Sequence, residues 1–354
     1  MEIVIGMDIM MAVVKTKPCP GNIELRNVGR PRLKLDEVLI EVKAAAICGS
    51  DIGIYDWNDP FHFIRLPIIM GHEYAGEVVE IGDAVEGFKV GDRVTGLATI
   101  GCGFCVECRM GRSNICTNRR TYGVHMNGAF AQYLAAPARF TVCLRDEIPF
   151  EVAAPLEAIA TAAHAVIERA SVRPGLKVAV LGPGPIGLYI VQFLKLLNVQ
   201  TIIVTGTNLD RERLRLASSL GADQTIDVTE KSAVEMVREI TENKGVDVVF
   251  EASGSHLALQ QGVSMLRRGG HLCLVGLGSQ PAKIAPKDIV REAITLQGVY
   301  ANTVETFEYV LRLIRAKKIH PELVTSNLLP IQEFARGFEL AKSKVGVKIV
   351  FTFR

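Results

Sequence analysis

Four cysteines stand close together in one glycine-containing loop, and their spacing is typical of a metal site. Cys102, Cys105, Cys108 and Cys116 follow the pattern C-x2-C-x2-C-x7-C. Four thiolates on a short turn can complete a tetrahedron around Zn2+ and leave no position open for water or substrate. Four unpaired thiols on an exposed loop, the alternative, would be vulnerable to oxidation. The sequence therefore predicts a structural zinc that cross-links this loop.

A second group of metal-ligand side chains is dispersed along the chain. Cys48 lies in AICGSD, His72 and Glu73 lie in MGHEYAG, and Glu157 lies in PLEAIATAAH. A thiolate, an imidazole and a carboxylate form the mixed ligand set of a zinc that keeps one position open for catalysis. Each residue alone is more typical of a core thiol, a core histidine or a surface acid. Because they are far apart in the chain, their spacing leaves open whether they meet.

A glycine-rich turn indicates a dinucleotide site. The segment 182–187 reads GPGPIG, follows an apolar strand predicted over 177–181 and opens an apolar helix. The glycines allow a tight turn and close approach of a pyrophosphate, and the helix N-terminus supplies amides for the phosphates. An ordinary tight turn would also fit the bare motif, but its context favours a nicotinamide dinucleotide. The residues assigned to this site are Gly182, Gly184, Pro185, Ile186 and Gly187.

The next predicted strand, TIIVT, ends without the acidic residue that binds the ribose of NAD. It runs instead into Gly206, Thr207 and Asn208, and the first acid is Asp210. Small neutral residues leave space for the 2'-phosphate of NADP, which Arg211 or Arg213 would neutralise, unless both arginines are simply solvated on a helix face. The sequence favours NADP over NAD, provided that Asp210 does not turn back to the ribose.

The elements that must position these groups follow two patterns. Up to about residue 160, short β-branched runs alternate with glycine turns, as in a β-rich, barrel-like domain. From residue 176 onward strands and helices alternate, as in a parallel α/β sheet. The predicted order is strand KVAVLG, helix IGLYIVQFLKLL, strand TIIVTG, helix DRERLRLASSLGAD, strand VDVVFEASG, a helix around HLALQQGVSMLRRGG, and strands HLCLVGL and ITLQGVY. This domain ends near Ala301, and a helix follows over 304–316.

Length, composition and charge exclude several classes of protein. The chain has 354 residues, which corresponds to about two domains. Apolar residues make up 49 % and charged residues 22 % of it, so it is neither disordered nor collagen-like. Forty Lys and Arg against 38 Asp and Glu leave a net charge of +2, too small for a protein whose main partner is a nucleic acid.

No targeting segment is predicted. The apolar start MEIVIGMDIMMAVV is interrupted by Glu2 and Asp8 and follows no basic region, unlike an export signal. The longest apolar stretch, 152–167, contains Pro155, Glu157 and His164, whereas a membrane span needs about 20 largely apolar residues. Eight cysteines are too few for a disulfide scaffold. We expect a soluble, cytoplasmic protein with a small-molecule substrate and no membrane partner.

With GHEYAGEVVEIG, the four-cysteine loop and GPGPIG in this order, the sequence resembles the zinc-containing medium-chain alcohol and polyol dehydrogenases over 13–353. It looks like the sorbitol and threonine dehydrogenase branch, because Glu157 stands where other family members use a third cysteine ligand. The resemblance implies a GroES-like β-barrel catalytic domain over 1–160, to which 302–354 returns, and an inserted Rossmann domain with a doubly wound parallel sheet over 161–301. It also implies a homo-oligomer, a dimer or a tetramer. Residues 1–10 look like an extension, so Met11 is a second candidate initiator.

The resemblance further implies roles for single residues. Two zinc ions are expected per chain, the catalytic one held by Cys48 and His72, with Glu157 or Glu73 near or on the metal. Asp51 matches the carboxylate that orients the zinc histidine, and Ser50 matches the hydroxyl that receives the alcohol proton. In the cofactor cleft, the family places Thr161 beside the nicotinamide and strand-end residues around the dinucleotide, here Ser253 and Leu277.

Two departures from the family pattern bear on the substrate. Gly53 replaces the relay histidine that many relatives carry five residues after the zinc cysteine. Leu97-Ala98-Thr99 stands where threonine dehydrogenases carry a histidine, which favours a polyol or sugar alcohol. The segment YDWNDPFH, with Trp57, Asp59 and His62, still resembles the threonine branch, so an L-threonine 3-dehydrogenase-type enzyme is the alternative. A non-catalytic dinucleotide-binding protein is a more distant one, because the ligand set is complete.

Overall fold

The structure, a computed structural model, describes residues 9–144 and 148–353. The predicted extension ahead of Met11 therefore lies, up to residue 8, outside the described residues. The chain divides into two compact units. The first comprises Met1–Glu157, Asn302–Arg315 and Thr325–Arg354, and the second comprises Ala158–Ala301 and Ala316–Val324.

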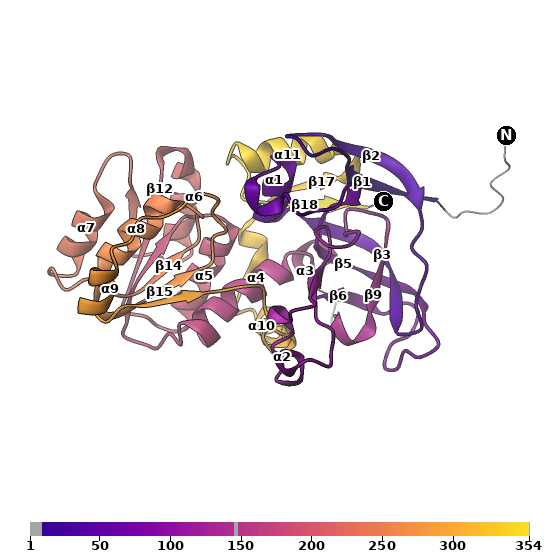
Figure 1. Ribbon diagram of the computed structural model, residues 1–354, viewed down its shortest axis with the longest axis horizontal. Helices are drawn as coiled ribbons and strands as arrows, with labels where there is room; N and C mark the ends of the chain where they lie inside the picture. Colours follow the sequence, from indigo (N-terminus) through magenta and orange to yellow (C-terminus); the bar gives the residue numbers. More distant parts are fainter. Residues whose placement is uncertain (1–8, 145–147, 354) are drawn as a thin grey trace. The chain divides into compact units, whose positions relative to one another are not determined.

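The first unit is built on a seven-stranded sheet of order β10-β6-β5-β3-β18-β17, in which β9 also pairs with β3 (Figure 1). Its longest strand, β3 (Glu37–Ala46), reads EVLIEVKAAA and is buried along most of its length, which is typical of a strand covered on both faces. The other strands of this sheet are β5 (Glu73–Ile81), β6 (Arg93–Gly96), β9 (Tyr133–Pro137), β10 (Thr141–Cys143), β17 (Thr325–Pro330) and β18 (Lys348–Thr352).

Smaller sheets and helices complete this unit. One sheet joins β1 (Ile9–Lys15), β2 (Ile23–Gly29) and β4 (Ile68–Ile69), and another joins β7 (Thr99–Ile100) and β8 (Arg120–Thr121). Aromatic rings tie the central strands to their surroundings, because Phe351 of β18 stacks edge-on against Phe130 with ring centroids 5.3 Å apart. The helices are α1 (Gly49–Tyr55), α2 (Val106–Arg109), α3 (Phe150–Ala153), α10 (Val304–Arg315) and α11 (Phe334–Lys342).

The second unit contains a six-stranded sheet of order β13-β12-β11-β14-β15-β16, in which every pair is parallel. Numbered along the chain within this unit, the order is 3-2-1-4-5-6, that of a dinucleotide-binding Rossmann sheet. The strands are β11 (Lys177–Leu181), β12 (Thr201–Gly206), β13 (Gln224–Asp227), β14 (Val246–Glu251), β15 (Leu266–Leu274) and β16 (Thr295–Gly298). The helices that flank it are α5 (Pro185–Leu196), α6 (Arg211–Ser219), α7 (Ala233–Ile240), α8 (His256–Met265) and α9 (Pro286–Arg291), and α4 (Leu156–Ala163) leads into the unit (Figure 1).

One predicted helix boundary is wrong. The helix expected around HLALQQGVSMLRRGG ends at Met265, and β15 begins at Leu266 instead of at the predicted HLCLVGL. Leu266 has an extended backbone and pairs with Val246, and Gly269 has a φ of 69°, which no helix interior allows. The pairing with a neighbouring strand therefore prevails over the local helix pattern.

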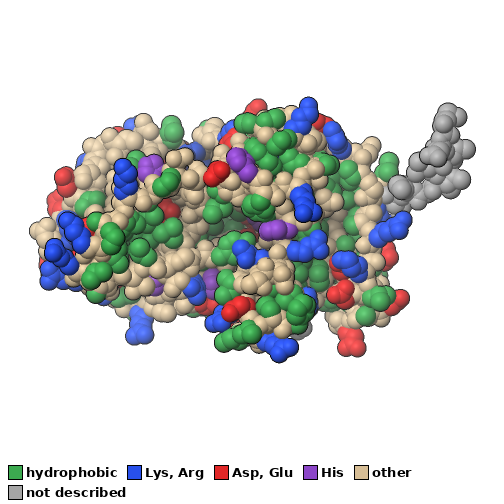
Figure 2. Space-filling model, in the orientation of Figure 1, with side chains coloured by type: hydrophobic (Ala, Val, Ile, Leu, Met, Phe, Trp, Pro, Cys, Tyr) green, Lys and Arg blue, Asp and Glu red, His purple; other side chains and the backbone are tan. Residues whose placement is uncertain are grey.

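One helical stretch, Phe150–Arg169, is long and apolar enough to cross a membrane by length and composition alone. Of its apolar window, 78 % is buried inside the protein, as in the core helices of globular proteins. Figure 2 shows both basic and acidic side chains on the face that it draws, with several Lys and Arg side chains grouped at its left edge.

Candidate active site

Strand pairing brings together two of the distant metal-ligand segments. In the antiparallel pair of β3 and β5, Ala46 lies opposite Glu73. Cys48 follows two residues after β3 and caps α1, while His72 directly precedes β5. One ligand atom each of Cys48, His72 and Glu73 lies within 4.8 Å of the others. The register of one strand pair therefore places three of the predicted residues in one cluster.

Asp51 connects the two ligand-bearing segments. Its carboxylate accepts a hydrogen bond from the amide of Cys48 (2.9 Å) and another from the amide of Gly71 (3.3 Å). Oδ1 of Asp51 also lies 3.8 Å from Nδ1 of His72, and both side chains are buried. Gly71 has a φ of 85°, and a Cβ there would lie 2.3 Å from the Phe130 ring, so the turn before His72 requires glycine.

The surroundings of His72 are strongly anionic. Burial disfavours the imidazolium, but Asp51 and Cys48 together hold the pKa of His72 well above its usual value. Oγ of Ser50 lies 3.3 Å from Nε2 of His72, where the resemblance places the proton-accepting hydroxyl. A thiol, an imidazole and carboxylates in an anionic pocket are the donors that Zn2+ selects. The cluster therefore fits a zinc ion.

The two candidate carboxylates occupy different environments. Both oxygens of Glu73 lie near Nζ of Lys348 at 2.6 Å, and that ammonium also donates to the carbonyl of Ile47 (2.9 Å). Glu157 instead accepts two hydrogen bonds from the amide of Asn302, one at its carbonyl oxygen (3.2 Å) and one at Oε1 (3.1 Å). Glu73 is a member of the 4.8 Å cluster, whereas Glu157 is not. Which carboxylate binds the metal stays a prediction.

The four loop cysteines also come together. Their four sulfur atoms all lie within 4.8 Å of one another. Cys105 is the N-cap of the short helix α2. The amides of Cys102 (3.4 Å) and Asn118 (3.3 Å) donate to the sulfur of Cys116. Backbone amides lower the pKa of Cys102 to about 6, while burial raises the pKa of Cys108 to about 12. Four thiols with amide donors fit a closed zinc site.

The glycine-rich turn of the second unit leaves room for a phosphate. Gly182 has a φ of 103°, and a Cβ there would lie 2.7 Å from that of Ser253. A Cβ on Gly187 would lie 2.1 Å from the carbonyl oxygen of Gly182. A Cβ on Gly184, the N-cap of α5, would meet nothing within 4 Å, and Pro185 follows at the helix start. Two glycines thus serve packing, and the third faces the open space that a pyrophosphate needs.

The carboxylate of Asp210, the first acid after β12, is hydrogen-bonded to the nearby Thr207. Oδ2 of Asp210 accepts from the amide (3.0 Å) and the hydroxyl (2.7 Å) of Thr207, closing a capping box over Asn208–Asp210. Arg213 is buried, and its Nη1 lies 3.9 Å from Oδ1 of Asp210. Arg211 is exposed and lies 3.2 Å from Glu230. The alternative, in which both arginines are solvated on a helix face, does not hold for Arg213, because its side chain is buried.

Three buried polar residues near the predicted groups escaped the sequence analysis. Lys348 begins the apolar strand β18, and Asn302 stands alone after the second domain, so neither belongs to a motif. Glu251 ends the strand VDVVFE, where its carboxylate accepts from the amides of Ser253 (2.8 Å) and Gly254 (3.0 Å) and from the Ser253 hydroxyl. A lone charged residue in an apolar run is the signal that would have found Lys348 and Glu251.

The remaining cofactor candidates belong to the second unit. Ser253 follows β14 and lies beside Gly182, as noted above, and Leu277 follows β15 with its side chain 66 % exposed. Thr161 is buried within α4. Gly206 is the last residue of β12, and a Cβ there would lie 3.0 Å from Pro183 of the glycine-rich turn. The ends of β11, β12 and β14 therefore adjoin this turn.

Comparisons with known proteins identify the family to which the chain is similar. The family model of the alcohol dehydrogenase GroES-like domain matches residues 34–146, and that of zinc-binding dehydrogenases matches residues 185–316. An L-threonine 3-dehydrogenase of Legionella pneumophila is 33 % identical over 346 residues, covering 97 % of this chain and 100 % of that protein. A sorbitol dehydrogenase of Halalkalibacterium halodurans is 35 % identical over 345 residues, covering 97 % and 99 %.

Solved structures give the same answer. The crystal structure of a zinc-binding dehydrogenase of Sinorhizobium meliloti bound to NADP has a TM-score of 0.88 at 30 % identity, covering 98 % of this chain and 99 % of that chain. The predicted family and fold class, a GroES-like domain combined with a Rossmann domain, are confirmed. The chain belongs to the zinc-containing medium-chain alcohol dehydrogenases, and it is a zinc-dependent oxidoreductase that uses a nicotinamide dinucleotide.

Proposed function

We propose that the protein oxidises a secondary alcohol, a polyol or sugar alcohol, and transfers the hydride to the nicotinamide of NADP. The cluster of Cys48, His72 and Glu73, with the Ser50 hydroxyl 3.3 Å from His72, carries this proposal. Zinc, when bound, polarises the alcohol oxygen and lowers its pKa. Cys48 and His72 would hold it, with Glu73 or Glu157 beside them.

The residues of this chain orient the site and accept the proton. Asp51 holds the amides of Cys48 and Gly71, and so keeps both ligand segments in place. The Ser50 hydroxyl is positioned to receive the alcohol proton next to His72. Gly53 carries no side chain that could pass the proton outward, and a Cβ there would lie 2.2 Å from the Phe61 ring. The proton therefore leaves Ser50 through water or through a group other than residue 53.

The segment Leu97-Ala98-Thr99 supports a polyol over L-threonine. All three residues are buried, and the Thr99 hydroxyl is within 3.1 Å of that of Thr121, so this segment itself offers no imidazole to an amino acid. The neighbouring imidazole of His125 accepts from the Thr121 amide at 3.2 Å. In the segment YDWNDPFH, which resembles the threonine branch, the polar groups bond to one another. Nε2 of His62 is hydrogen-bonded to the Trp57 carbonyl (2.8 Å), and the two rings stack. The threonine dehydrogenase relative makes L-threonine the second candidate.

The test is the initial rate of NADP+ and NAD+ reduction by the purified enzyme. The panel contains polyols, sugar alcohols, L-threonine and simple secondary alcohols at equal concentration. We expect the highest kcat/KM with a polyol or sugar alcohol and NADP+, and loss of turnover in Cys48→Ser with the fold retained. A kcat/KM highest for L-threonine would replace the proposal with the second candidate. Full activity of Cys48→Ser would refute both.

Two further features belong to this proposal. Each chain holds two zinc ions, one at each cluster, because both donor sets fit the metal. The enzyme is a cytoplasmic dimer or tetramer: Phe104, Val106 and Met110 on the cysteine loop are 67, 69 and 60 % exposed, and apolar side chains gathered in this way typically mark a protein interface. Metal analysis of the purified protein tests the zinc count, and sedimentation velocity tests the oligomeric state.

A further inference from the structure

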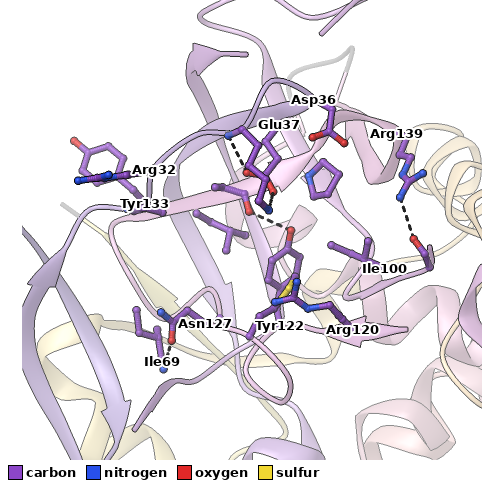
Figure 3. Close-up of a pocket in the computed structure, with 18 of the residues that line it drawn as sticks. Arg32, Asp36, Glu37, Ile69, Ile100, Arg120, Tyr122, Asn127, Tyr133 and Arg139 are labelled. Atoms are coloured by element: carbon purple, nitrogen blue, oxygen red, sulfur yellow. Dashed lines mark hydrogen bonds and ion pairs between the residues drawn. The ribbon is translucent and has the colours of Figure 1, made fainter. Parts of the chain in front are cut away.

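A pocket apart from the Cys48 cluster opens in the first unit, where Gly101, Cys102 and Phe104 of the cysteine loop form part of its lining (Figure 3). Its volume is about 580 Å3, within the range of sites for small organic ligands. Its floor is apolar and preformed, since Met10, Ile69, Ile100, Tyr122 and Leu134 are each less than 10 % exposed. None of the residues of the Cys48 cluster lines it. The pocket is therefore separate from the proposed alcohol site.

The charges around the pocket do not cancel. Four cations and two carboxylates line it: Arg32, Lys34, Arg120, Arg139, Asp36 and Glu37. Lys34 and Glu37 neutralise each other at 2.7 Å. Arg139 donates to the carbonyl of Gly101 at 3.1 Å, which satisfies one of its donors but leaves its charge.

Two guanidinium groups are free to receive an anion. Within the described residues, neither Arg32 nor Arg120 has a hydrogen-bond or ion-pair partner, and the same holds for the side chain of Asp36. Figure 3 shows Arg32 beside Tyr133 on one side of the pocket, and Arg120 and Arg139 on the other side with Ile100 between them. Asp36 lies at the rim near Arg139. An apolar floor flanked by unpaired guanidinium groups is complementary to an anion that has an apolar body.

We propose that this pocket binds an organic anion, a carboxylate attached to an aromatic or aliphatic body. The body would cover the side chains of Ile100 and Tyr122, and the carboxylate would take charge-assisted hydrogen bonds from Arg120 or Arg32. The carboxylate of Asp36 opposes this binding, since it is the one acid of the lining without a cationic partner in the described chain. This proposal does not depend on the alcohol substrate of the enzyme.

The probe is 2-naphthoate, titrated by isothermal calorimetry into the full-length, zinc-loaded enzyme saturated with NADPH. Its uncharged counterpart, 2-naphthamide, has the same shape and lacks the charge. We expect one naphthoate site per chain and binding of the amide at least about tenfold weaker, as for the loss of one charge-assisted hydrogen bond. The double variant Arg32→Gln/Arg120→Gln should weaken naphthoate at least about tenfold as well.

Three variants control this result. Arg215→Gln/Arg336→Gln removes two exposed arginines that are paired elsewhere and should bind naphthoate like the parent. Asp36→Asn removes the opposing charge and should tighten binding by about two- to fivefold. Cys48→Ser should bind naphthoate unchanged, because a carboxylate seated on the catalytic metal would lose its affinity in this variant and one seated in the pocket would not.

Several outcomes would overturn the proposal. Equal binding of naphthoate by the parent and the Arg32→Gln/Arg120→Gln variant would show that the arginines do not form the site. Loss of binding in Cys48→Ser would place the anion at the metal cluster. A third outcome is that the parent enzyme binds no naphthoate while the Arg32→Gln/Arg120→Gln variant has a lower oligomeric state by sedimentation velocity. That result would show that the pocket contacts a second copy of the chain instead.

Discussion

Nζ of Lys348 lies 2.6 Å from the carboxylate of Glu73, and both side chains are almost wholly buried, with 1 % and 0 % of their surface exposed. The pair lies beside the predicted zinc ligands, since Glu73 shares a cluster with Cys48 and His72. Burying a carboxylate without a cation is costly, and the Lys348 ammonium supplies the opposite charge beside Glu73. The last strand of the chain thereby supports a ligand segment that is 275 residues away.

Lys348→Met should destabilise the protein strongly. The substitution leaves Glu73 buried without its cation and the Ile47 carbonyl without its donor, which costs about 3–5 kcal/mol of unfolding free energy. Urea unfolding of the zinc-loaded enzyme measures it. Lys348→Met/Glu73→Gln should regain part of the loss, because the charge is removed with its partner. A single variant as stable as the parent would show that the pair contributes no net stability.

Cys116→Ser should reduce the zinc content from two ions per chain to one. Cys116 is fully buried and its sulfur accepts two backbone amides, so its loss opens the tetrahedron while leaving the Cys48 cluster untouched. Inductively coupled plasma mass spectrometry of the dialysed protein gives the number of zinc ions per chain. Cys19→Ser, which replaces an exposed cysteine outside both clusters, is the matched control and should keep two. One zinc in the parent would contradict the prediction of two sites.

Arg211→Gln should raise the KM for NADP+ about tenfold and leave the KM for NAD+ nearly unchanged. Arg211 is exposed, and within the described residues its ion-pair partner is Glu230 at the surface. Such a surface pair is worth little, so the guanidinium can turn to meet a 2'-phosphate. Arg213 is held against Asp210 and neutralises that acid. Arg215→Gln, on the same helix and paired with Glu212, is the control. An equal change of the KM for both cofactors would show that Arg211 does not distinguish NADP+ from NAD+.

Local signals made much of the fold predictable, and long-range pairing made the rest unpredictable. The cysteine loop and the GPGPIG turn are contiguous, so their geometry follows from spacing and from glycine backbone freedom. The meeting of Cys48 with His72 depends on the register of β3 and β5, which no local pattern states and which only the family resemblance supplied. Lys348 belongs to no motif, because its partner is determined by the order of strands in the sheet.

Burial raises the pKa of Glu251, against the hydrogen bonds from Ser253 and Gly254 that lower it. A carboxyl group whose pKa is raised by folding stabilises the folded state at pH values below its unfolded pKa, and this stabilisation is lost as the pH rises through the folded value. The melting temperature of Glu251→Gln relative to the parent should therefore increase as the pH rises above 4.5, the ordinary pKa of a glutamate. Calorimetry across this range tests it, and a pH-independent difference would contradict it.

Lys15→Met should change both the stability and the tryptophan fluorescence of the protein. Lys15 is fully buried, and its ammonium donates to the carbonyls of Cys19 (2.6 Å), Gly21 (2.5 Å) and Tyr55 (2.9 Å). Three carbonyl acceptors would lose their charged donor, at a cost of about 3 kcal/mol. Nζ also lies 5.7 Å from the ring of Trp57, the only tryptophan of the chain.

The fluorescence separates this local role from a general loss of stability. Because Trp57 follows α1, whose first turn carries Ser50 and Asp51, a spectral change in folded Lys15→Met would report displacement at the end of this helix. Its KM for alcohol should then rise more than its kcat falls, since the helix end moves and the ligand cluster stays. Lys17→Met, an exposed neighbour, should leave spectrum and KM unchanged. An unaltered spectrum in Lys15→Met would show that the ammonium stabilises the loop without positioning the helix.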